Sequence, residues 1–201
     1  MQPRFERIAP DLFCWQGDSC NVYVIQRDDA AILVDIGSGA VLDALGQIGV
    51  RRVEQVWFTQ HQREQTQGAA RIPATAQIVA PAAEGALFTD PGRFRTAEAR
   101  PGPYTVGGAL YVRLPREPVR VDRTVGDGDS LTWRGLSCEV YETAGASRGA
   151  VSYVLDRGGE RWAFTGNVCL AGGKAFRLFD SEWDYGYAAG FQALLASQQL
   201  L

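Results

Sequence analysis

Short runs of β-branched and aromatic residues alternate with helical patterns along the chain, and glycine or aspartate pairs separate them. Three such runs, at 12–15, 20–26 and 31–35, follow one another closely. They predict three consecutive strands joined by tight turns. A segment with apolar residues at helical spacing, 41–48, comes next and ends before Gly49, which is typical of a helix stop.

The alternation continues through the rest of the chain. A strand at 53–59 precedes a short helix near Gly68, and a strand at 77–80 precedes a helix at 81–88. Beyond a long loop, the same reading predicts further strands at 109–114, 130–133, 136–142, 151–156 and 161–165.

The segment 89–103 carries three prolines and several arginines, which predicts a long surface loop. At the other end, 184–201 predicts an amphipathic helix that packs against a sheet. Its apolar residues at helical spacing are Tyr187, Phe191, Leu194, Leu195 and Leu201. Strands mixed with outer helices and no internal repeat predict one domain, 1–201, of the α+β class or a four-layer αββα sandwich.

Composition narrows the function classes. Hydrophobic residues make up 46% of the 201 residues and charged residues 21%, which is ordinary for a globular protein. The net charge is −3 with both signs interspersed, so no basic face for nucleic acid is expected. Without an apolar run of about 18 residues or a secretory signal, we expect a cytoplasmic protein that does not bind membranes.

The most informative segment is Val56–Gly68, where a strand ends at Thr59, a polar loop follows, and a glycine opens a helix. It resembles the signature loop of the metallo-β-lactamase superfamily, Thr-His-x-His-x-Asp-His-x-x-Gly. In that family, imidazoles and a carboxylate on this loop bind one or two zinc ions, which activate water.

Four further segments resemble the family's motifs in the same order. They match, respectively, a strand ending in Asp-x-Gly, an Asp-Gly-Asp hairpin, Thr-Pro-Gly-His-Ser-x-Gly and Phe-Thr-Gly-Asp: Ile32–Gly39, Asp127–Asp129, Thr143–Gly149 and Phe164–Asn167. The resemblance spans about 13–195. It implies the αββα sandwich of the metallo-β-lactamases as the fold.

The metal ligands that the resemblance implies are replaced in this chain. The six matching positions, which define a vacated polar pocket, are Gln60, Gln62, Glu64, Gln65, Ala146 and Asn167. Amides are poor zinc ligands beside imidazole or carboxylate, and Glu64 is the one charged residue of the six. We therefore expect no zinc and no other cofactor. A weakly held hard cation at Glu64 is less excluded, since oxygen donors suit calcium or magnesium.

Two further residues, Asp35 and His61, are expected to contact the pocket residues and hold them in place. Asp35 follows a strand, where an aspartate more often orders the adjacent loop than catalyses a reaction. His61, the single histidine, stands at a spacer position of the motif. We favour a solvent-exposed or supporting role for it over that of a relocated general base.

The family's closing helix is normally followed by a strand that carries a last histidine. This chain stops at Leu201, where that strand would begin, so it is either a fragment or a naturally shortened protein. An uncovered sheet edge or apolar strip is then expected, and a homodimer or a complex with a related active subunit would cover it.

Three functions remain open. The favoured one is a non-catalytic protein, a pseudoenzyme that acts as a binding or assembly subunit, as degenerate domains of this fold do beside active ones. The second is a hydrolase with an unusual metal site or a metal-free site, in which Glu64 would act as the general base. The third is a protein that binds a small polar ligand in the vacated pocket, with 89–103 as a lid.

Overall fold

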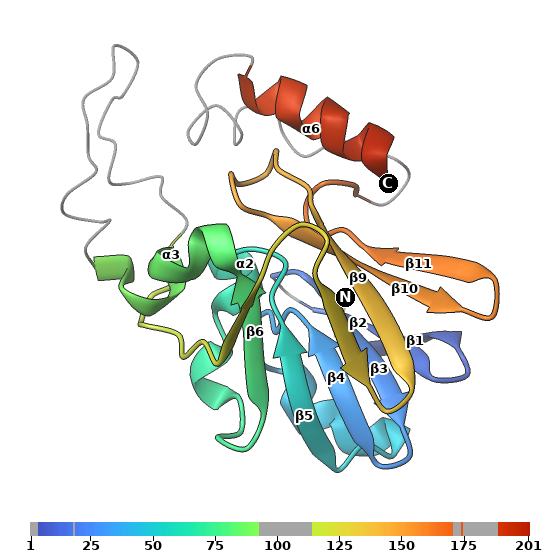
Figure 1. The fold of residues 1–201 in the computed structure, drawn as a ribbon. Helices are drawn as coiled ribbons and strands as arrows, with labels where there is room; N and C mark the ends of the chain where they lie inside the picture. Colours follow the sequence, from blue (N-terminus) through green and yellow to red (C-terminus); the bar gives the residue numbers. More distant parts are fainter. Residues whose placement is uncertain (1–3, 18, 93–113, 171–173, 175–188) are drawn as a thin grey trace.

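The computed structural model describes residues 4–17, 19–92, 114–170, 174 and 189–201. A seven-stranded sheet runs in the order β1-β2-β3-β4-β5-β6-β7 (Figure 1). Its strands are β1 (Arg4–Ala9), β2 (Leu12–Gln16), β3 (Asn21–Arg27), β4 (Ala30–Val34), β5 (Arg52–Trp57), β6 (Gln77–Pro81) and β7 (Arg123–Val125). Strands β1 to β4 are antiparallel neighbours, and β4 to β7 are parallel.

The second sheet is antiparallel and has the order β11-β10-β9-β8. Its strands are β8 (Ser130–Trp133), β9 (Leu136–Glu142), β10 (Val151–Arg157) and β11 (Glu160–Phe164). The helices of the described residues are α1 (Val41–Ala44), η1 (Leu45–Ile48), α2 (Arg63–Thr66), η2 (Ala69–Arg71), η3 (Ala82–Glu84), α3 (Gly85–Thr89) and α6 (Ala189–Leu200).

Both faces of the first sheet are buried at β4, and the sequence of this strand is therefore apolar throughout. Ile32 and Val34 belong to a core shared with Trp57 and with Tyr153 of the second sheet. The alternate residues of β4 belong to a separate core that contains residues of α1, η1 and α3. The sheets therefore pack face to face, and helices cover the outer face of the first one. This arrangement confirms the expected sandwich.

Two strands, β1 and β7, were not predicted from the sequence. The edge strand β1 is mostly exposed and carries charged residues, so its hydrophobic alternation is weak. Strand β7 has three residues, too few to show a period. Most of the expected strand at 109–114 and most of the expected loop 89–103 lie outside the described residues.

The expected hairpin at Asp127–Asp129 is wrong. This turn joins β7 of the first sheet to β8 of the second, so the chain changes sheets there. Asp129 Oδ2 accepts a hydrogen bond from the backbone of Gly126 at 2.8 Å, and Asp127 Oδ1 accepts one from Glu142 at 2.9 Å. The turn chemistry was predicted correctly, but local sequence does not report which sheet a strand joins.

The closing helix α6 makes fewer apolar contacts than its sequence predicts. It is described from Ala189, so 184–188 lie outside the described residues. Leu194 is buried against Gly145, and Ser197 donates to the carbonyl of Ala144 at 2.7 Å. In contrast, the expected packing residues Phe191, Leu195 and Leu201 are 38%, 43% and 43% exposed.

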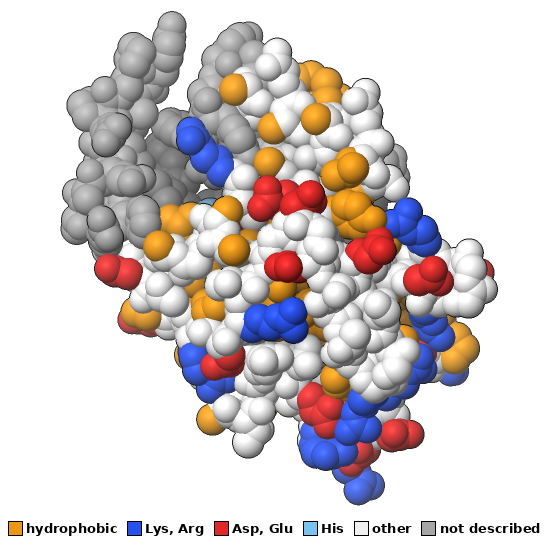
Figure 2. All heavy atoms as spheres, in the orientation of Figure 1, with side chains coloured by type: hydrophobic (Ala, Val, Ile, Leu, Met, Phe, Trp, Pro, Cys, Tyr) orange, Lys and Arg blue, Asp and Glu red, His pale blue; other side chains and the backbone are white. Residues whose placement is uncertain are grey.

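The distribution of surface charge and the lengths of the described helices agree with what the sequence predicts. The face in Figure 2 carries acidic and basic side chains side by side rather than a field of one sign. Within the part of the chain that the structure describes, no helix has the length and apolar character needed to span a membrane.

Candidate functional site

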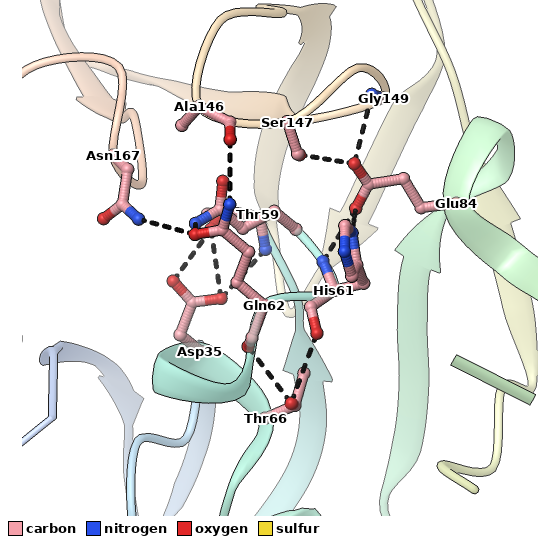
Figure 3. A network of polar contacts seen from close by, with 11 residues as sticks. Asp35, Thr59, His61, Gln62, Thr66, Glu84, Ala146, Ser147, Gly149 and Asn167 are labelled. Atoms are coloured by element: carbon pink, nitrogen blue, oxygen red, sulfur yellow. Dashed lines mark hydrogen bonds and ion pairs between the residues drawn. The ribbon is translucent and has the colours of Figure 1, made fainter. Parts of the chain in front are cut away.

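Three of the loops that carry the family-like motifs meet at one end of the two sheets (Figure 3). One follows β5, a second joins β9 to β10, and a third follows β11. Two hydrogen bonds fasten the first loop to the second sheet. Val151 donates its backbone N–H to the carbonyl of Thr59 at 2.9 Å, and the Tyr153 hydroxyl donates to the carbonyl of Phe58 at 2.8 Å.

Four side-chain amides, Gln60, Gln62, Gln65 and Asn167, form what we call the amide cluster. Gln62 Oε1 accepts hydrogen bonds from Gln60 Nε2 at 3.2 Å and from Asn167 Nδ2 at 3.3 Å. Gln62 Nε2 donates to the carbonyl oxygen of Ala146 at 2.8 Å. Gln65 Nε2 lies 3.4 Å from Asn167 Oδ1. The cluster thereby joins three loops, although its members are up to 107 positions apart in the printed sequence.

The structure therefore brings together five of the six predicted pocket positions. The sixth, Glu64, lies between Gln62 and Gln65 in sequence, in the first turn of α2, and is half-buried. That these residues bind a ligand remains a prediction.

Asp35 has the supporting role that the sequence predicts, because it holds the loop that follows β5. It lies just after β4 with a φ of 61°, in the left-handed region that aspartate tolerates better than most residues. Its carboxylate accepts the Thr59 backbone N–H at 2.9 Å and the Thr59 hydroxyl at 2.9 Å. Burial raises the pKa of Asp35 to about 7, although the hydrogen bonds from Thr59 oppose the shift.

His61 is buried, so the solvent-exposed alternative is wrong. Its ring points away from the amide cluster toward Glu84 (Figure 3). Glu84 Oε2 lies 2.8 Å from His61 Nδ1 and accepts the His61 backbone N–H at 2.7 Å. Glu84 Oε1 accepts the Ser147 hydroxyl and the Gly149 backbone N–H, the latter at 3.1 Å. We call these four residues the Glu84 clamp.

The clamp is built to hold loops rather than to activate a nucleophile. In a serine hydrolase the hydroxyl pairs with an imidazole that takes its proton. Here Ser147 donates to the carboxylate of Glu84, and His61 contacts the other oxygen of the same group. Burial alone would raise the pKa of Glu84, but the hydrogen bonds and charge of His61 outweigh it and hold that pKa below its ordinary value.

Sequence reasoning missed Glu84. Its partners lie 23, 63 and 65 positions away, and nothing in the local sequence separates it from a surface glutamate. Ser147 offered a better signal, because it matches the serine of the family's Thr-Pro-Gly-His-Ser motif.

The residues present do not fit the zinc ions that the fold family implies. Among the described residues, no group of three or more His, Cys, Asp or Glu side chains is placed to hold a metal. Gln62 uses its oxygen and its nitrogen on neighbouring groups, and the other donors of the cluster are also neutral amides. Zinc prefers imidazole, thiolate or carboxylate.

Solved metallo-β-lactamases resemble the chain over nearly its whole length. One from Cronobacter sakazakii, described by a HARLDQ motif, is 20% identical, and the match covers 100% of this chain and 76% of that one with a TM-score of 0.73. FEZ-1 from Legionella gormanii is 15% identical, with 100% and 77% covered and a TM-score of 0.69. BJP-1, a subclass B3 enzyme of Bradyrhizobium japonicum, is 20% identical, with 98% and 72% covered and a TM-score of 0.67.

These likenesses show that the chain has the metallo-β-lactamase fold. No protein-family model and no curated protein matches it.

The first prediction concerns the clamp. Glu84→Gln places an amide where four donors converge, so it should lower the free energy of unfolding by about 3–5 kcal/mol at neutral pH. Urea unfolding measures the change. Glu139→Gln, at an exposed position of β9, is the control and should change it by less than about 1 kcal/mol.

Because the folded-state pKa of Glu84 is lowered, its stabilising contribution is present above its unfolded pKa and is lost as the pH falls through the folded value. Equal stability of the two variants would contradict a structural role for the clamp.

The second prediction concerns Asp35. Its raised pKa means that its contribution to stability is full below the unfolded value of 3.8 and is lost as the pH rises through about 7. Asp35→Asn keeps an oxygen for the Thr59 N–H but cannot ionise. Relative to this variant, the wild type should lose up to about 4 kcal/mol of stability between about pH 4 and 7.

Chemical unfolding across that pH range measures the difference. Asp28→Asn is the matched control, since Asp28 is an exposed aspartate that also has a positive φ, 54°. Parallel curves for the wild type and Asp35→Asn would show that Asp35 ionises normally in the folded protein.

Proposed function

We propose that this protein of the metallo-β-lactamase fold is a non-catalytic binding or assembly subunit. One observation carries the proposal. The positions that match the family's metal ligands hold amides that hydrogen-bond to one another and to the carbonyl of Ala146.

Hydrolysis in the family depends on a metal that lowers the pKa of water. Gln62 would have to break two hydrogen bonds to turn its oxygen toward a metal, and it would bring no charge. Of the six matched positions, Glu64 alone carries a charge, which does not balance a dinuclear zinc centre. The amide cluster thus favours binding over water activation.

The Glu84 clamp supports the same proposal. In a metalloenzyme, ligands from separate loops are cross-linked through the metal. Here a buried carboxylate joins His61, in the loop after β5, to Ser147 and Gly149, in the loop before β10. The loops can therefore keep their positions without a metal.

A hydrolase with an unusual site is the second candidate, and one of the similar structures favours it. The Cronobacter sakazakii protein is a metallo-β-lactamase by name, yet its HARLDQ motif departs from the family pattern. Set against 60–65, it has Arg at the position of Gln62 and shares glutamine with Gln65. An altered motif thus occurs in a protein that carries the name of the enzyme family.

The third prediction separates the two candidates. Protein purified without chelator should hold zinc well below one equivalent by elemental analysis, because amides are weak zinc ligands. It should also leave a chromogenic β-lactam intact with added zinc. Stoichiometric zinc that is lost in Glu64→Ala, or hydrolysis that needs Glu64, would favour the hydrolase.

A restored variant is the control for this experiment. It carries Gln60→His, Gln62→His, Glu64→Asp, Gln65→His, Ala146→His and Asn167→Asp. This variant should bind zinc if the loops have the family's geometry.

The assembly part of the proposal rests on α6. Phe191 and Leu195 lie one helical turn apart and are both more than a third exposed. Neighbouring exposed apolar side chains of this size favour contact with another protein, and a second copy of the chain is the simplest partner.

The fourth prediction is that the protein forms a dimer that dissociates on dilution, measured by light scattering over a concentration series. Phe191→Glu or Leu195→Glu should shift it to the monomer, because each would bury a charge at the contact. Gln192→Glu adds the same charge at an exposed position of the same helix and should leave the dimer intact. A monomer at every concentration would exclude self-assembly.

A further inference from the structure

The hydrogen bonds of the amide cluster have a fixed direction, because one of them ends on the backbone. The carbonyl oxygen of Ala146 can only accept, so Gln62 must present its nitrogen to it, at 2.8 Å. This orientation turns Gln62 Oε1 to the opposite side, toward Gln60 and Asn167.

The orientation of Gln62 then sets the other three amides. Gln60 and Asn167 must both turn their nitrogens toward Gln62 Oε1, at 3.2 and 3.3 Å. Asn167 Oδ1 consequently faces Gln65, which presents its nitrogen at 3.4 Å. Rotating any one of these amides by half a turn would set oxygen against oxygen or nitrogen against nitrogen, so the usual ambiguity of amide orientation is removed here.

Two acceptors remain at the ends of this chain of amides. Gln60 Oε1 and Gln65 Oε1 accept no hydrogen bond from the described residues, although Gln60 is fully buried and Gln65 is 1% exposed. A buried polar oxygen without a donor costs free energy, on the order of 1–3 kcal/mol. A group that fills this need must donate hydrogen bonds, and burial of both oxygens requires it to be small.

We infer that the amide cluster is a binding site for an ammonium-type N–H donor, either the ammonium ion or the head group of a primary amine. The inference deepens the proposed function and rests on it, because it takes the cluster as a binding site and not as a metal centre. Anions such as phosphate or carboxylate would meet acceptors with acceptors. A charged N–H donor forms a stronger hydrogen bond to an amide oxygen than a neutral donor does.

Alkali ions suit the site less well. Hard cations in proteins generally collect six or more oxygen ligands, whereas the cluster leaves two oxygens available. An N–H donor satisfies an amide oxygen with a single hydrogen bond, so ammonium or an amine head group can bind at an end oxygen without such a shell. The site should therefore select for the N–H bond and not for positive charge alone.

The fifth prediction tests this selectivity on the whole, unmodified chain. Side-chain amide signals of the cluster are followed by ¹⁵N NMR during titration with ammonium, methylammonium, tetramethylammonium, potassium and acetate salts at constant ionic strength. Ammonium or methylammonium should give saturable shifts confined to the four amides. Tetramethylammonium, which has the charge but no N–H bond, and acetate should give none, and potassium should bind at least about tenfold more weakly.

The first two salts also distinguish the two sources of the head group. Binding of methylammonium indicates an amine ligand, and binding of ammonium alone indicates the free ion. Gln60→Met and Gln65→Met remove the end oxygens and should weaken binding by about tenfold or more. Gln67→Met changes an exposed glutamine of the same loop and should have no effect. The salt series decides the matter by itself if a variant fails to fold.

Equal binding of potassium or tetramethylammonium, binding of acetate, or no saturable shift would each overturn the inference. If the protein is also free of zinc and inactive, the proposed function stands and the ammonium site alone is wrong. Stoichiometric zinc on the cluster would remove both.

Discussion

The arrangement of the loops around the candidate site depends on the hydrogen bonds of one buried carboxylate, that of Glu84. It gathers the backbone N–H groups of His61 and Gly149, the ring of His61 and the hydroxyl of Ser147. An acid that is 1% exposed is tolerated in the interior only when its oxygens are satisfied in this way. Its hydrogen bonds fix the spacing of the two loops from which Gln62 and Ala146 come.

The amide cluster depends on that spacing. Gln62 reaches the carbonyl of Ala146 across the gap between the loops, and this one hydrogen bond orients the other amides. The metallo-β-lactamase fold thus keeps the convergence of its loops while the groups that converge have changed from charged ligands to neutral donors and acceptors. Such groups suit recognition of a polar molecule better than polarisation of water.

Much of the fold could be predicted from local pattern. The apolar run of β4, the alternation in β8 and β9, and the order of the five family-like segments were sufficient to predict the αββα sandwich. The two strands that were not predicted are β1, a mostly exposed edge strand, and β7, which has three residues. In such strands burial imposes little or no alternation of apolar and polar residues. In α6 the apolar spacing overstated the packing, because Phe191 and Leu195 are more than a third exposed. The spacing also does not register Ser197, which is buried and donates a hydrogen bond to Ala144.

The sequence by itself determined which positions would meet, because motif order and spacing carry the family's topology: Gln60, Gln62, Gln65, Ala146 and Asn167 do lie together. It also determined their chemistry, since amides replace the ligands. Only the tertiary structure decided the roles of His61 and Glu84, and which amide oxygens accept no hydrogen bond from the described residues. Both depend on contacts between residues 23 to 105 positions apart, and the direction of such hydrogen bonds follows from three-dimensional placement, which no local pattern records.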